Sequence, residues 1–80
     1  MNGWCKFTAE DENGLVILYS LESNQSCDGM LFFDKDTDEI VVTALSRGAT
    51  LKLTEHFICS VRGRMRRGFE LNKLYYLAVG

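Results

Sequence analysis

The sequence predicts a single α+β domain in which a mainly antiparallel sheet of about five strands carries one helix on one face. Short segments rich in β-forming apolar residues fill residues 4–45 and return at residues 74–79. Between them, from Leu53 onward, the apolar period changes to every fourth residue, as on one face of a helix. The chain has 80 residues, no proline and no linker-like stretch, so residues 1–80 form one domain. The predicted element order is β-β-β-β-α-β.

The first two strands form a hairpin. Residues 4–9 (WCKFTA) place β-forming side chains on alternating sides. The turn segment EDENG follows, and Asn13-Gly14 predicts a tight turn with positive φ. Residues 15–21 (LVILYSL) begin with five apolar residues, which leaves both faces apolar and is typical of a central strand.

The third and fourth strands, residues 30–33 and 40–45, flank the acidic segment DKDTDE. Its aspartates, at positions 34, 36 and 38, match the first three ligand positions of a helix-loop-helix calcium loop. However, Glu39 stands where that loop needs glycine, and Leu45 stands where it needs a bidentate glutamate. A hairpin turn with acidic side chains at its tip explains the segment better, and no metal site is expected.

Four apolar residues recur every four positions and predict the helix: Leu53, Phe57, Val61 and Met65. Thr54 is a candidate N-cap, and Gly68 after two arginines is a typical C-terminal glycine. Gly63 disfavours a helix interior, so either a neighbour packs closely there or the helix ends near Arg62 and residues 63–68 are partly loop. We favour the continuous helix. Residues 74–79 (LYYLAV) predict the last strand.

One helix covers only one side of a five-stranded sheet, yet the strands at residues 15–21 and 74–79 carry apolar side chains on both sides. The uncovered face would expose a larger apolar patch than soluble monomers usually show. We therefore expect a homodimer, formed by sheet packing or by pairing of strand edges. The alternative is a strongly curled sheet that closes on itself like a small barrel.

Charge is divided unevenly along the chain. Residues 1–40 hold nine acidic and two basic side chains, a balance of −7, whereas residues 41–80 hold seven basic and two acidic ones, a balance of +5. Such asymmetry marks either a binding face or attraction between the two halves, within the fold or across a dimer.

The segment RGRMRRG carries the strongest chemical signal, with Arg62, Arg66 and Arg67 as candidate anion-binding residues. Guanidinium groups bind phosphates, and this supports an alternative function in nucleic-acid or anionic-ligand binding. Against it, cations in a last helical turn are favoured by the helix dipole, and a chain with net charge −2 lacks the usual basic footprint of nucleic-acid binders.

His56 and Cys59 form the sole pair that resembles metal or nucleophile chemistry, because residues three apart share one side of a helix. The sequence offers neither the further ligands of a zinc site nor an orienting carboxylate for catalysis. Three widely spaced cysteines, Cys5, Cys27 and Cys59, are expected as buried thiols. Nucleotide-binding glycine motifs and the G-x-S-x-G elbow do not occur, so we expect neither a cofactor nor an enzyme.

The longest apolar runs are far shorter than the ~20 residues of a membrane span. The N-terminal segment MNGWCKFTAE lacks the layout of a signal peptide, so a cytoplasmic location is expected. The sequence does not reveal a biological process. It predicts a small non-enzymatic cytoplasmic domain that acts through self-association and through contacts with another protein.

Overall fold

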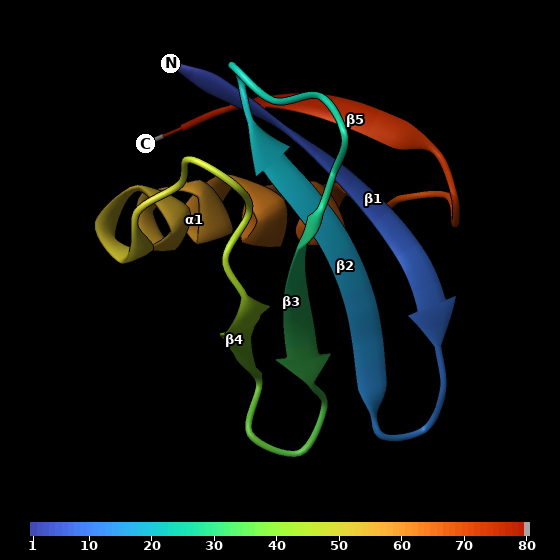
Figure 1. Ribbon diagram of the computed structural model, residues 1–80. Coiled ribbons are helices and arrows are strands. Elements are labelled where there is room, and N and C mark those ends of the chain that lie inside the picture. The colour runs from blue at the N-terminus through green and yellow to red at the C-terminus, as the bar shows by residue number, and fades with distance from the viewer. Residues whose placement is uncertain (80) are drawn as a thin grey trace.

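The computed structural model describes residues 1–79 and shows an antiparallel sheet with a single helix lying across one face (Figure 1). The elements in chain order are β1 (Asn2–Glu10), β2 (Gly14–Leu21), β3 (Gly29–Asp34), β4 (Glu39–Ala44), α1 (Leu51–Arg67) and β5 (Leu74–Ala78). This confirms the predicted α+β class and the order β-β-β-β-α-β.

The strands lie side by side in the order β4-β3-β2-β1-β5, and every neighbouring pair is antiparallel. The central position of β2 agrees with its two-sided apolar composition. After the helix, the chain returns to add β5 beside β1 (Figure 1). Within residues 1–79 the two outer strands, β4 and β5, do not pair with each other, so the sheet is open and the small-barrel alternative is wrong.

The hydrophobic core lies between the sheet and α1. Residues that pair across antiparallel strands point to the same face of a sheet. Cys5 pairs with Tyr19, and Ile17 pairs with both Phe7 and Leu31, so these five side chains lie on the face toward the helix. These side chains are buried. The helix contributes Phe57 and Val61, both fully buried, and their spacing is the one that predicted the helix.

The helix begins one turn earlier than the sequence suggests. Thr50 is the N-cap, because its hydroxyl oxygen accepts a hydrogen bond from the Leu53 N–H at 3.1 Å. The prediction that Thr54 caps the helix is wrong: Thr54 lies inside the first turns and is fully buried. Its hydroxyl donates to the Thr50 carbonyl oxygen (2.8 Å) and lies 2.9 Å from the Tyr19 hydroxyl. The buried Tyr19 hydroxyl needs hydrogen-bond partners, and Thr54 supplies one of them from inside the helix.

The helix runs without interruption through Gly63 to Arg67, and the Gly68 N–H donates to the Met65 carbonyl oxygen at 3.2 Å. This agrees with the continuous helix that we favour, so residues 63–67 are not loop. Nothing packs closely on Gly63 either. A Cβ atom built there would meet only the Nη1 end of the flexible Arg67 side chain, at 3.4 Å.

Replacement of Gly63 by alanine is therefore expected to stabilise the protein by about 0.5–1 kcal/mol, because alanine loses less backbone entropy in a helix. Urea unfolding followed by far-ultraviolet circular dichroism measures the change. An unchanged or lower unfolding midpoint would contradict the open surroundings of this position.

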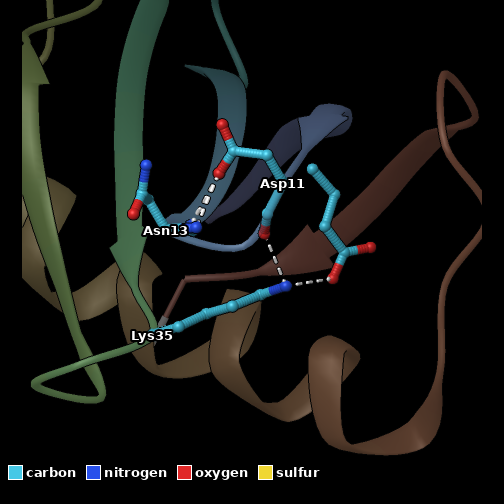
Figure 2. Close-up of polar contacts among 5 residues, drawn as sticks. Asp11, Asn13 and Lys35 are labelled. Atoms are coloured by element: carbon cyan, nitrogen blue, oxygen red, sulfur yellow. Dashed lines mark hydrogen bonds and ion pairs between the residues drawn. The ribbon is translucent and has the colours of Figure 1, made fainter.

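The β1–β2 turn is closed by a side chain. The Asp11 carboxylate accepts hydrogen bonds from the N–H groups of Asn13 (2.8 Å) and Gly14 (3.1 Å); the bond to Asn13 is drawn in Figure 2. The expected positive φ at Asn13-Gly14 is wrong, since neither residue has one. Glycine is needed at position 14 for a different reason: a Cβ atom there would collide with the carbonyl oxygen of Phe33 on β3.

The acidic segment between β3 and β4 is a hairpin turn, as predicted. The Asp38 N–H donates to the Asp34 carbonyl oxygen (2.8 Å), and the Asp36 N–H donates to the Asp34 carboxylate (2.9 Å). Asp38 has a φ of 61°, a left-handed conformation that aspartate tolerates better than most residues. Figure 2 shows that Lys35 links this hairpin to the β1–β2 hairpin. Its Nζ lies 3.1 Å from a Glu10 carboxylate oxygen and donates to the Asp11 carbonyl oxygen at 2.7 Å.

The loop between β2 and β3 is fastened to the segment before the helix through Asp28. This carboxylate accepts hydrogen bonds from the Ser46 hydroxyl (2.6 Å), the Asn24 amide (3.0 Å) and the Arg47 N–H (3.3 Å). The Ser46 hydrogen bond is the largest of the effects that lower the pKa of Asp28 below its usual range. The ionised form is thus favoured in the folded protein.

A lowered folded-state pKa gives a stability contribution that is complete above the unfolded value of about 3.9 and disappears as the pH falls through the folded value. We therefore expect Asp28→Asn to be less stable than wild type at neutral pH. The difference should shrink as the pH is lowered below about 4. Unfolding midpoints measured in urea across this range provide the test, and a difference that is constant with pH would contradict it.

Candidate functional site

The face of the sheet opposite the helix is largely apolar and is not covered by any described segment over most of its extent. The strand register places side chains from all five strands on it, because they pair across the strands in rows. We call this surface the open face; it consists of Trp4, Lys6, Val16, Leu18, Met30, Phe32, Val41, Leu74 and Tyr76.

Several large apolar side chains on the open face are in contact with solvent. The exposed fraction is 40% for Met30, 43% for Val41, 46% for Leu74 and 48% for Tyr76. Beside Tyr76 lies Trp4, with ring centroids 4.3 Å apart. Single exposed apolar residues are ordinary, whereas large contiguous apolar patches are uncommon on soluble monomers.

The borders of the open face are polar. At one end the β2–β3 loop covers it: Ser20 is fully buried there, and its hydroxyl oxygen accepts a hydrogen bond from the Cys27 N–H at 3.2 Å. At the other end, strand alternation places Asp34 and Glu39 on this side of the sheet. Lys6 stands on the β1 side and forms no ion pair with any residue from 1 to 79. Lys6 lies between Leu18 on β2 and Leu74 on β5, so the open face carries one base within its apolar surface and two acids at one end.

The arginines at the end of α1 do not form one basic surface. Arg64 lies over the Tyr75 ring, 5.2 Å from its centroid, and its Nε donates to the Gly68 carbonyl oxygen at 3.1 Å. Arg62 turns toward the β3–β4 hairpin, where its Nη1 is 3.7 Å from an Asp38 carboxylate oxygen. Part of the attraction between the acidic and basic halves is therefore internal.

A pocket of about 200 Å³ lies between the helix and the β3–β4 hairpin. It is lined by Phe33, Asp38, Arg62, Met65 and Arg66. Of the three candidate anion-binding residues, the structure thus brings Arg62 and Arg66 together at the pocket. Arg67 is exposed and is not part of the pocket lining.

His56 and Cys59 are both exposed on the helix. No hydrogen bond joins them within the described chain; the Cys59 thiol is 4.0 Å from the Glu55 carbonyl oxygen instead. Its exposure contradicts the expectation that all three cysteines are buried, since position 59 lies opposite the apolar stripe. Cys5 and Cys27 are buried, and burial raises the pKa of the Cys5 thiol to about 12, so this thiol is not a nucleophile at neutral pH.

Sequence patterns could locate the open face only in part. The two-sided apolar strands predicted that such a face exists, but the Trp4–Tyr76 contact joins residues from opposite ends of the chain and depends on β5 lying beside β1. Asp38 was also missed as the partner of Arg62. Its role depends on the hairpin reaching the helix, and no local signal encodes that.

The helix of the described residues, α1, is not long and apolar enough to cross a membrane. Comparison of the chain with models of known protein families, with curated proteins and with solved structures finds no match.

Proposed function

We propose that this protein is a small non-enzymatic association domain, whose open face packs against the open face of a second copy. The observation that carries the proposal is the contiguous apolar surface contributed by all five strands, with exposed fractions of 40–48% at its largest exposed side chains. Burial of these side chains against a partner removes apolar area from water, which stabilises association.

The dimensions fit a dimer of ordinary size. The Cα trace extends 33 × 22 × 20 Å. Stable interfaces of standard size bury ~800 Å² per partner, so most of one broad side of a chain this small would have to take part. Aromatic and methionine side chains such as Trp4, Tyr76 and Met30 are also the types enriched at interface centres.

The charges on the open face favour a second copy over an unrelated partner. Lys6 lacks an acidic partner within the described residues, while Asp34 and Glu39 stand elsewhere on the same side of the sheet. In a symmetric dimer the same surface is used by both copies, so the base of one copy is available to the acids of the other. Contacts with another protein would then use surfaces that the dimer leaves free.

Nucleic-acid binding through the arginines has less support. Arg62 and Arg64 already contact Asp38 and Tyr75, and the acidic β3–β4 hairpin stands beside Arg62. A polyanion would meet these carboxylates as it approached.

The free thiols of the buried Cys5 and Cys27 support the proposed cytoplasmic location, since reducing compartments keep cysteines in that form.

Two lysine substitutions test the proposal. Met30→Lys places a charge on the open face at a side chain that is 40% exposed, so the monomer fold should tolerate it. We expect the dissociation constant of the dimer to rise about tenfold or more, because the lysine charge would be buried in the interface without a partner. Sedimentation velocity at several concentrations measures this change.

Leu51→Lys is the matched control. Leu51 is 54% exposed and lies at the start of α1, on the other side of the sheet. The Leu51→Lys substitution should leave the dissociation constant of the dimer unchanged. If Met30→Lys sediments like wild type, or if Leu51→Lys weakens the dimer equally, the open face is not the interface.

A further inference from the structure

The pocket beside the β3–β4 hairpin has the chemistry of a ligand site and is independent of the open face. Phe33 pairs with Leu15 and Ile40 on the helix side of the sheet, so the pocket opens on the opposite side from the proposed dimer interface. Its volume of about 200 Å³ is below the ~300–1,000 Å³ of sites for drug-sized ligands. The ligand must be correspondingly small.

Arg62 is the more buried of the two arginines that line this pocket. Its side chain is only 27% exposed, and its one described ion pair, to Asp38, spans 3.7 Å. No hydrogen bond from its guanidinium to any residue of the described chain is formed. A guanidinium carries five N–H donors, and none of those of Arg62 is both buried and without a partner, so they face water. An acceptor from outside the chain would replace that water.

The surroundings define which acceptor fits. Arg66 lies one helical turn beyond Arg62 and lines the same pocket, so two guanidinium groups face one carboxylate, that of Asp38. This balance of +1 complements a single negative charge. A phosphate dianion or a polyanion would be repelled by the acidic hairpin that holds Asp38. Phe33 and Met65 supply an apolar lining for the rest of the ligand.

We propose that this pocket binds a monocarboxylate carried on a small apolar or aromatic body. The carboxylate would accept hydrogen bonds from Arg62 and Arg66, and the body would lie against Phe33 and Met65. Asp38, whose side chain is 80% exposed, pairs with Arg62 at 3.7 Å, and a bound carboxylate would compete with it for the Arg62 guanidinium. A free carboxylic acid and the C-terminal residue of a peptide share this chemistry.

Titration of ¹⁵N-labelled protein with 3-phenylpropionate, followed by amide chemical shifts, tests the proposal. We expect saturable shifts that concentrate around Phe33, Asp38 and Met65, and no such shifts with the neutral 3-phenylpropionamide. Acetyl-Gly-Phe with a free C-terminus distinguishes the source of the carboxylate: tighter binding than 3-phenylpropionate assigns the site to peptide termini, and weaker binding assigns it to free acids. Equal shifts with the amide, or tighter binding of inorganic phosphate, would overturn the proposal.

Three variants make the test specific. Arg62→Gln should weaken binding about tenfold or more, the usual effect of losing a charge-assisted hydrogen bond. Arg67→Gln is the matched control, because it removes the same charge outside the pocket, and it should bind as wild type does. Asp38→Asn should bind more tightly, since asparagine tolerates the φ of 61° and no longer competes for Arg62. Equal losses in Arg62→Gln and Arg67→Gln, or weaker binding by Asp38→Asn, would overturn the site.

Discussion

Replacement of Phe57 by alanine is expected to destabilise the protein by about 3–5 kcal/mol, the usual loss for a buried phenylalanine. Phe57 is fully buried at the centre of the contact between α1 and the sheet. Its ring lies 6.2 Å from the ring of Tyr19. A Cβ atom built at Gly3 would lie 2.7 Å from its Cε1 atom, so the first strand approaches the ring as closely as glycine permits.

The loss is large compared with the stability available. Domains are stable by about 5–15 kcal/mol, and a chain of this size buries a smaller share of its surface than most. We therefore expect Phe57→Ala to be largely unfolded at moderate temperature in thermal denaturation. Phe57→Leu keeps most of the apolar volume and should lose much less. If the two variants melt together near the wild-type temperature, Phe57 does not anchor the helix to the sheet.

Gly14→Ala is the second large effect, with an expected loss of about 3 kcal/mol, the upper part of the range for overpacked sites. The new Cβ atom would collide with the Phe33 carbonyl oxygen, which belongs to the backbone of β3 and cannot rotate away. It would also lie too close to the Phe32 ring. Either β2 and β3 separate at this end or their pairing Gly14–Asp34 is lost.

Gly63→Ala is the natural control, since the same chemical change there is expected to stabilise the protein. Opposite signs of the two changes in urea unfolding would show that the space around each glycine decides the outcome. Stabilisation by Gly14→Ala would contradict the close approach of β2 and β3.

The contrast between these glycines also shows what sequence patterns can and cannot predict. A two-residue period and a four-residue period are local properties, so all five strands and the helix were predicted nearly to their ends. The expected positive φ at Gly14 was wrong, and neither alternative for Gly63, close packing or an end of the helix near Arg62, is found. At Gly14 the deciding feature is the nearby backbone of β3, which local sequence patterns do not reveal.

The same distinction holds for the candidate sites. Arg62, Arg66 and Arg67 were selected from the arginine-rich segment RGRMRRG, and the first two line the pocket. Phe33 and Asp38 complete the pocket but come from the hairpin, so only the folded chain joins them to the helix. Thr54 was taken for the cap, whereas the buried hydroxyl of Tyr19 holds it one turn inside the helix.

Sedimentation equilibrium combined with tryptophan fluorescence can show whether two copies associate through the open face. Trp4 is the single tryptophan of the chain and stands on the open face beside Tyr76, so its emission reports whether this surface is covered. We expect a particle of twice the chain mass, with Trp4 emission that shifts to shorter wavelength as dilute monomer is concentrated into dimer. A particle of single chain mass at every concentration, or a dimer that forms without a change in Trp4 emission, would contradict it.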